Sequence, residues 1–213
     1  MDNIALMIFL SIGIPLALSL ALFEKRARVT VTFLIAGMLM ALIISQINTL
    51  LLQLFDYDRN FVTTTITPAT EELIKALPIL YFAFVFEPKK NIMINISFAV
   101  GLGFAIFENL VMLSEIYEGA TVTWALIRGF GAGLMHSLCT LLVGLCTMYI
   151  RENKRLFVCG TFSMLALAII YHSIYNCLVL SDYSYLGLIL PMATYSPFII
   201  YQILQKRREK KDV

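Results

Sequence analysis

The segment Thr70–Lys75 carries the side chains best suited to chemistry, two adjacent glutamates followed by a lysine. On a helix, Lys75 lies four residues after Glu71 and three after Glu72, so it can pair with either carboxylate. One lysine cannot neutralise two glutamates, and the second carboxylate is free to be protonated or to do chemistry. The alternative interpretation is a self-neutralising ion pair near a membrane surface.

Glu108 and His136 each follow small residues at helical spacing. Gly101 and Ala105 precede Glu108 by seven and three residues, which predicts that another helix packs closely beside this carboxylate. Gly129 and Gly133 precede His136 by seven and three residues, and Gly144 follows it by eight, so we predict the same close packing there. Taken singly, an interfacial glutamate and a hydrogen-bonded structural histidine are equally reasonable interpretations.

His172 and Asn176 lie one helical turn apart and share a helix face. Asn176 can therefore hydrogen-bond a reacting group or hold the tautomer of His172. Two histidines and a carboxylate can form a three-ligand zinc site with a fourth position for water, and a further glutamate can take a proton from that water. The HExxH motif of soluble zinc proteases is absent, and Ser137 and Ser173 point to other helix faces than their neighbouring histidines.

The elements that position these residues are expected to be transmembrane helices. Of the 213 residues, 60% are hydrophobic and only 14% are charged, whereas soluble domains carry about a quarter charged residues. The mean hydropathy is +0.84, and apolar stretches of roughly 20 residues, enough to cross a bilayer as a helix, recur along the chain. The predicted fold class is all-α, a polytopic transmembrane helix bundle of about seven spans at 4–22, 31–54, 63–86, 92–113, 123–150, 156–180 and 184–205.

The spans are predicted to form a single integral membrane domain over residues 1–213, because no separate soluble domain is visible. The catalytic spans are expected within about 63–180, and the spans 4–22, 31–54 and 184–205 are expected to be peripheral. We find no internal repeat, which disfavours a transporter because many transporter folds are built from paired halves.

Basic residues in the connections predict an orientation. Alternate connections and the C-terminal tail carry 13 lysines and arginines, while the opposite side carries only Arg59. Because cytoplasmic loops are enriched in lysine and arginine, the N-terminus is predicted outside and the C-terminus in the cytoplasm.

This orientation predicts the depth of each ionisable residue. At 1.5 Å per helical residue, Glu71 and Glu72 lie roughly 12–14 Å below the outer ends of their spans, Glu108 roughly 8 Å and His172 roughly 12 Å. His136 comes out at roughly 20 Å, in a span whose start is poorly defined. Unrelated polar residues would be scattered in depth, so we predict one site in the outer half of the bilayer, built from four helices.

Four motifs occur in order along residues 65–180. They are Glu71-Glu72-x-x-Lys75, Phe104-Ala105-x-x-Glu108-Asn109, His136 with Gly144 eight residues later, and His172-x-x-x-Asn176. In order, approximate spacing and span placement they resemble the PrsW family of intramembrane proteases, which is related to the CAAX prenyl proteases and the Abi proteins. The match is weakest around His136.

The resemblance implies a role for each matched residue. Glu71 or Glu72 would activate water, and Lys75 would orient one of these glutamates or hold it ionised. Asn176 would donate a hydrogen bond to the oxyanion. One divalent metal ion, with zinc as the expected ion, would be bound by Glu108, His136 and His172. A metal-free mechanism, in which a glutamate and a histidine activate water together, stays open.

The resemblance also implies a substrate and a location. The chain would be an endopeptidase of the bacterial cytoplasmic membrane that cuts a membrane-anchored protein near the outer leaflet. The implied substrate is a single-pass anti-sigma factor, whose cleavage starts a stress response; no nucleic-acid partner is expected. A proton-coupled transporter, since glutamate and histidine chains also build proton relays, and a non-catalytic membrane assembly partner are the rival hypotheses.

Overall fold

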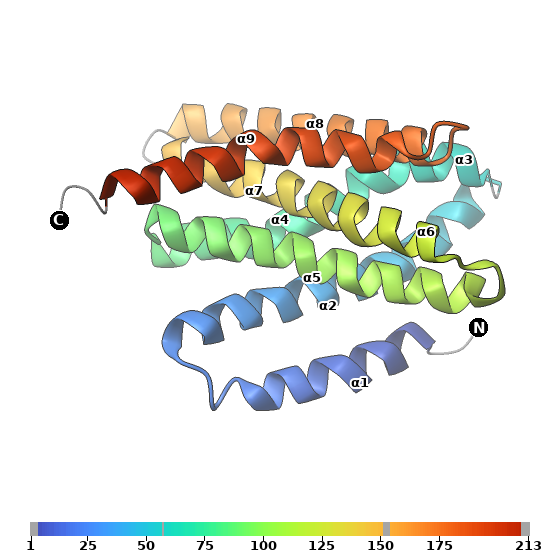
Figure 1. The fold of residues 1–213 in the computed structure, drawn as a ribbon, viewed down its shortest axis with the longest axis horizontal. Coiled ribbons are helices and arrows are strands. Elements are labelled where there is room, and N and C mark those ends of the chain that lie inside the picture. Colours follow the sequence, from blue (N-terminus) through green and yellow to red (C-terminus); the bar gives the residue numbers. More distant parts are fainter. Residues whose placement is uncertain (1–3, 57, 151–153, 210–213) are drawn as a thin grey trace.

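The described residues, 4–56, 58–150 and 154–209 of a computed structural model, are helical with short connections (Figure 1). Each predicted span coincides with a long helix or with a helix that has a short lead-in. The elements are α1 (Ile4–Ser19), α2 (Lys25–Leu54), α3 (Arg59–Phe61), η1 (Val62–Ile66), α4 (Thr67–Phe86), α5 (Lys90–Ile116), η2 (Tyr117–Gly119), α6 (Val122–Leu126), η3 (Ile127–Ala132), α7 (Gly133–Ile150), α8 (Lys154–Val179) and α9 (Leu186–Glu209).

Four helical segments of the described residues are long and apolar enough to cross a membrane: Lys25–Leu54, Lys90–Ile116, Val122–Met148 and Val158–Val179. The chain is therefore a multi-pass membrane protein. The helix α4 has a different character, because Glu71, Glu72 and Lys75 interrupt its apolar sequence.

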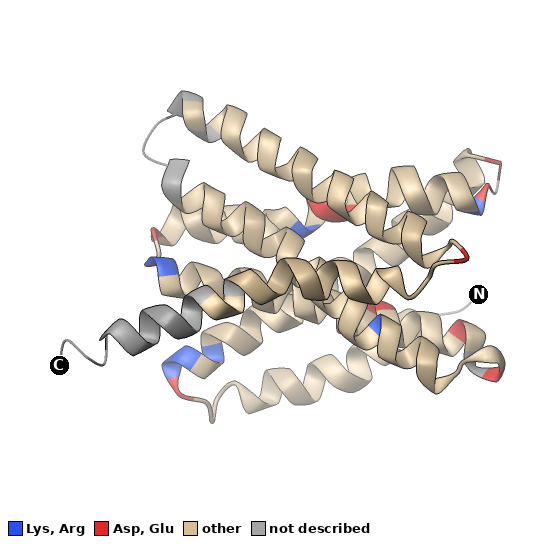
Figure 2. Cartoon of the chain, turned by 45° about the horizontal axis from the view of Figure 1, so that its top comes forward, with Lys and Arg blue, Asp and Glu red and all other residues tan. Residues whose placement is uncertain are grey.

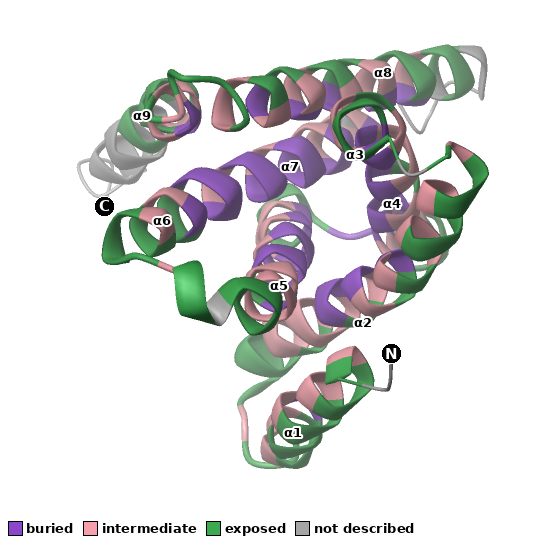
Figure 3. Cartoon of the chain, turned by 90° about the vertical axis from the view of Figure 1, so that its right-hand side faces the viewer, coloured by how far each residue is buried: buried purple, intermediate pink, exposed green. Residues whose placement is uncertain are grey.

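The long helices run up and down along one axis, and each reverses the direction of the one before it (Figure 1). Seen end-on, buried residues gather on α4, α5 and α7, whereas α1 lies at the edge of the bundle (Figure 3). The core therefore lies between the helices that carry the predicted site residues. The positions that face outward are largely apolar, including Leu73, Leu77 and Phe84 on α4, as expected of a surface that meets lipid.

Two lead-in segments are π-helical rather than α-helical. The segment η1 precedes α4, which carries the glutamate pair, and η3 precedes α7, which carries His136. A π turn holds one residue more than an α turn, and such turns often occur at functional sites. In this chain they change the phase of the helices just before the site residues.

Glycine packing agrees with the sequence prediction on α5 and only in part on η3 and α7. A Cβ atom on Gly101 would overlap the carbonyl oxygen of His136, so α5 and α7 approach closely beside the site. The prediction is wrong for Gly129 and Gly133, because no described residue outside their own stretch of helix lies within 4 Å of the place a Cβ would take. It is confirmed for Gly144, whose Cβ would overlap the hydroxyl oxygen of Ser97.

Gly101 and Gly133 provide a matched pair of substitutions. We expect Gly101→Ala to lower the free energy of unfolding by about 1–3 kcal/mol, because the backbone of α7 must move to admit the methyl group. Gly133→Ala should be neutral or stabilise the helix by up to about 1 kcal/mol. Thermal melting of the purified proteins in detergent measures both changes, and equal melting temperatures would contradict the packing of α5 on α7.

Candidate active site

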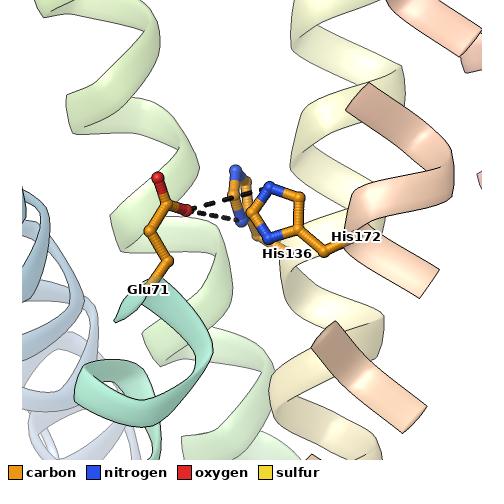
Figure 4. Close-up of side chains that lie close together, drawn as sticks. All are labelled: Glu71, His136 and His172. Atoms are coloured by element: carbon orange, nitrogen blue, oxygen red, sulfur yellow. Dashed lines mark ion pairs between the residues drawn. The ribbon is translucent and has the colours of Figure 1, made fainter. Parts of the chain in front are cut away.

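Six of the seven predicted site residues meet in one cluster at the centre of the bundle. The helices α4, α5, α7 and α8 supply Glu71, Glu72, Lys75, Glu108, His136 and His172. Five of them are buried, and the side chain of Glu108 is 26% exposed. Three side chains point directly toward one another, Glu71 from one side and the imidazoles of His136 and His172 from the other (Figure 4).

The cluster shows that His136 lies level with the other residues, although the residue count had placed it deeper. Its ring centroid is 4.9 Å from that of His172, and its Nε2 atom lies 3.0 Å from Glu108. The depth of His136 along the bundle is set by the packing of α7 against α5 and α8, so counting residues from the start of its span does not predict it.

Hydrogen bonds define the tautomer of His172. Its Nδ1 atom lies 2.8 Å from Oε1 of Glu72. An ionised carboxylate only accepts hydrogen bonds, so Nδ1 carries the proton and donates it. In the neutral imidazole the lone pair then belongs to Nε2, which lies 3.9 Å from Oε2 of Glu71.

His136 has the opposite tautomer. Its Nδ1 atom lies 2.7 Å from the ammonium nitrogen of Lys75, which has only protons to offer. Nδ1 therefore accepts, and the proton sits on Nε2, which donates to Oε2 of Glu108 at 3.0 Å. The Nδ1 lone pair is 4.0 Å from Oε2 of Glu71. Both imidazoles thus turn their lone pairs toward the same carboxylate.

The two adjacent glutamates differ in their partners. Oε1 of Glu72 accepts from Lys75 at 2.6 Å and from His172 at 2.8 Å. Oε2 of Glu71 is buried and has no hydrogen-bond partner among the described residues, and the ammonium group of Lys75 is 3.8 Å away. Glu72 is therefore committed to its neighbours, and Glu71 is the carboxylate that remains free.

The donor atoms fit a metal ion. One carboxylate oxygen of Glu71 and one nitrogen each of His136 and His172 lie within 4.8 Å of one another, and all three residues are buried. The gaps of 3.9 and 4.0 Å to Glu71 are close to the roughly 3.4 Å between neighbouring ligands of a tetrahedral zinc ion. Three electron-rich atoms this close together are stabilised by a cation, and in this structure the ammonium group of Lys75 lies beside two of them, 2.7 Å from Nδ1 of His136 and 3.8 Å from Oε2 of Glu71. Nδ1 of His136 has a single lone pair, so it serves either Lys75 or a metal ion, and Lys75 keeps Glu72 as a second partner.

Glu108 stands outside this group of three, although it was predicted as a metal ligand. Its Oε2 atom accepts from Nη2 of Arg128 at 2.6 Å and from Nε2 of His136 at 3.0 Å. Glu71 occupies the ligand position that was expected for Glu108, because Glu108 contacts the ring nitrogen of His136 that faces away from Glu71. Sequence reasoning gave Arg128 no role; an arginine inside an apolar span that needs an anionic partner was the available signal.

Asn176 lies beside the cluster and contacts the lead-in of α4. Its amide nitrogen donates to the carbonyl oxygen of Thr63 in η1 at 2.9 Å. An amide nitrogen has two N–H groups, so one donor remains for another acceptor.

A model of the PrsW family of intramembrane metalloproteases matches residues 25–202. The matched range contains every residue of the cluster, Arg128 and Asn176, and it leaves out α1. No curated protein and no solved structure matches the chain.

Proposed function

We propose, because the chain belongs to the PrsW family of intramembrane metalloproteases, that it hydrolyses a peptide bond of a membrane-anchored protein near the outer leaflet. The observation that carries this proposal is the buried oxygen of Glu71, which has no hydrogen-bond partner among the described residues and faces one nitrogen each of His136 and His172. Membership of a protease family also disfavours the transporter and the assembly partner as alternatives.

The proposed roles follow from the partners of each residue. Glu71, His136 and His172 would hold a zinc ion, which when bound polarises a carbonyl group and acidifies water. Oε2 of Glu71 would bind the ion, and the second oxygen of the same carboxylate would accept the proton of the attacking water, because Glu72 is already held by two donors. The second N–H of Asn176 donates to the carbonyl oxygen as negative charge develops there. Glu108 and Glu72 each fix one imidazole, and such partners of metal-binding histidines raise their basicity and set their orientation.

In the orientation that we propose for the chain, the residue count along the helices puts this site in the outer half of the bilayer. The connections α1–α2 and α4–α5 carry basic residues and lie at the same end of the bundle (Figure 2), which by the positive-inside rule is the cytoplasmic end. Arg151, Lys210 and Lys211, which also belong to the basic set, lie outside the described residues. The N-terminus is then outside, the seven helical passes each cross the membrane, and residues 1–213 form one membrane domain.

A single-pass anti-sigma factor of the bacterial cytoplasmic membrane is the proposed substrate. Each part of this assignment rests on the family resemblance and on the outer position of the cluster. A stress response controlled by such a factor would then depend on the cut.

Mapping the cut tests the proposal. We expect the purified enzyme, reconstituted with a single-pass reporter protein, to cleave within the outer half of the reporter's membrane segment or just outside it. Mass spectrometry of both fragments locates the bond, because the two new termini define it. Cleavage confined to the cytoplasmic side of the reporter would contradict the proposed orientation, and no cleavage of any membrane-anchored reporter would contradict the function.

A further inference from the structure

Arg128 is a buried cation that the proposed chemistry does not use. It lies in η3, only 7% exposed. An arginine at membrane depth is costly unless its charge and its donors are matched. Its Nη2 atom donates to Oε2 of Glu108 at 2.6 Å, and its Nε atom donates to Oδ1 of Asn109 at 2.8 Å. The amide of Asn109 in turn donates to the carbonyl oxygen of Arg128 at 3.2 Å.

The π-helical segment η3 explains how Arg128 reaches this place. Arg128 precedes His136 by eight residues, which in a regular α-helix puts the two side chains about 80° apart around the axis. A π turn inserts about one extra residue, which reduces the separation to about 20°. The turn therefore brings Arg128 onto the face of His136, where both side chains contact the same oxygen of Glu108.

The cluster thus contains two hydrogen-bonded triads of the same kind, each with a cation, a carboxylate and an imidazole. In the first, Lys75 contacts Glu72, and Glu72 contacts His172. In the second, Arg128 contacts Glu108, and Glu108 contacts His136. The triads hold opposite ring nitrogens, Nδ1 of His172 and Nε2 of His136. The unprotonated nitrogens, Nε2 of His172 and Nδ1 of His136, therefore both face Glu71, and that of His136 also accepts from Lys75.

We propose that Arg128 is a positioning residue that, through Glu108, holds the Nε2–H group of His136 and keeps its Nδ1 atom directed toward Lys75 and Glu71. The positioning itself does not depend on the proposed function. Only its purpose, which is to prepare Nδ1 of His136 to bind a metal ion, rests on that function. Two donors of one guanidinium group, on Glu108 and on Asn109, hold the carboxylate in a fixed direction. A lysine cannot reproduce this, since its ammonium group lacks the planar fork.

Nitrogen NMR of the imidazoles tests the proposal directly, because the chain has only two histidines. In metal-free wild-type protein, labelled with ¹⁵N in the histidine rings and assigned with single-histidine variants, we expect His136 as Nε2–H and His172 as Nδ1–H. In Arg128→Gln the Nε2–H signal of His136 should shift and broaden, because Glu108 is no longer held by the guanidinium group, while Lys75 still donates to Nδ1 and the signals of His172 stay unchanged. Arg128→Lys should restore the wild-type signals only in part.

Zinc affinity provides a second readout without any substrate. Arg128→Gln should weaken zinc binding, measured by competition with a chromophoric chelator, by roughly 10- to 100-fold. Arg59→Gln, an exposed arginine outside the cluster, is the matched control and should bind zinc as the wild type does. If Arg128→Gln does not fold, Asn109→Ala removes the partner of Nε and the donor to the carbonyl oxygen of Arg128 but keeps the contact of Arg128 with Glu108. It should shift both readouts in the same direction by less.

Each outcome decides the proposal. Unchanged signals of His136 together with unchanged zinc affinity in the foldable variants would overturn it, as would His136 found as Nδ1–H in the wild type. A protein that shows the expected tautomers and zinc affinities but cleaves no reporter would overturn the proposed function alone and leave the role of Arg128 intact.

Discussion

The Glu71→Gln variant is expected to cleave a membrane-anchored reporter at least about 10³-fold more slowly than the wild type, measured as kcat/KM in detergent or liposomes. An amide cannot take the proton of the attacking water, and general-base catalysis contributes about 10²–10⁴-fold. The loss of a negatively charged ligand oxygen beside His136 and His172 adds to this effect. The change in shape is minimal, so the protein should keep its fold.

Glu115→Gln is the matched control for this experiment. Glu115 lies exposed on α5, outside the cluster, and its replacement should leave cleavage unchanged. If Glu71→Gln cut the reporter at the wild-type rate with its melting temperature intact, Glu71 would have no part in the reaction. The assignment of the proton acceptor would then pass to another carboxylate.

The His172→Ala variant should lose cleavage to a similar extent, by about 10³-fold or more, because it removes one of the two imidazoles that face Glu71. The variant also removes one of the two donors to Oε1 of Glu72, so that Lys75 is the donor that remains. The expected result is a folded protein that binds a substrate segment but does not cut it. Cross-linking of the reporter to the variant separates binding from catalysis.

Cys177→Ala serves as the control on the same helix, because Cys177 is an exposed residue of α8 outside the cluster. It should cleave the reporter as fast as the wild type. Substantial cleavage by His172→Ala would show that the imidazole is structural, which was the alternative interpretation of a single buried histidine.

Much of the fold could be predicted from the sequence because it depends on local composition. Apolar stretches of roughly 20 residues mark helices that can cross a bilayer, and the polar connections between them mark the turns. The predicted span 31–54 ends at the same residue as α2, and 63–86 at the same residue as α4. Local composition also shows that Glu71, Glu72 and Lys75 lie within an apolar helix.

The partners of the site residues could not be predicted, since they depend on helix phase and on rotamers. Which of Glu71 and Glu72 stays free is decided by where His172 and Lys75 reach. Glu108 was expected beside the metal, and the ring nitrogen it meets on His136 is known only from the packing of α5 on α7. A π turn is likewise invisible in a helical sequence pattern, so the alignment of Arg128 with His136 was missed.

Helix packing around a glycine, as at Gly133, could not be predicted from the sequence either. Glycine at helical spacing from a polar residue indicates that a close approach is possible, but it does not show that a neighbour uses the space. Gly101 is pressed against His136, while the space at Gly133 is left open. Only the placement of the neighbouring helices separates the two cases.

The metal content of the purified protein tests the central claim most directly. We expect about one zinc ion per chain in the wild type and in Cys177→Ala, and a large loss of zinc in His172→Ala, with cleavage by the wild type abolished by a chelator and restored by zinc. Full cleavage by a protein that contains no metal and resists chelators would contradict the account, and would leave Glu71 and a histidine to activate water without an ion.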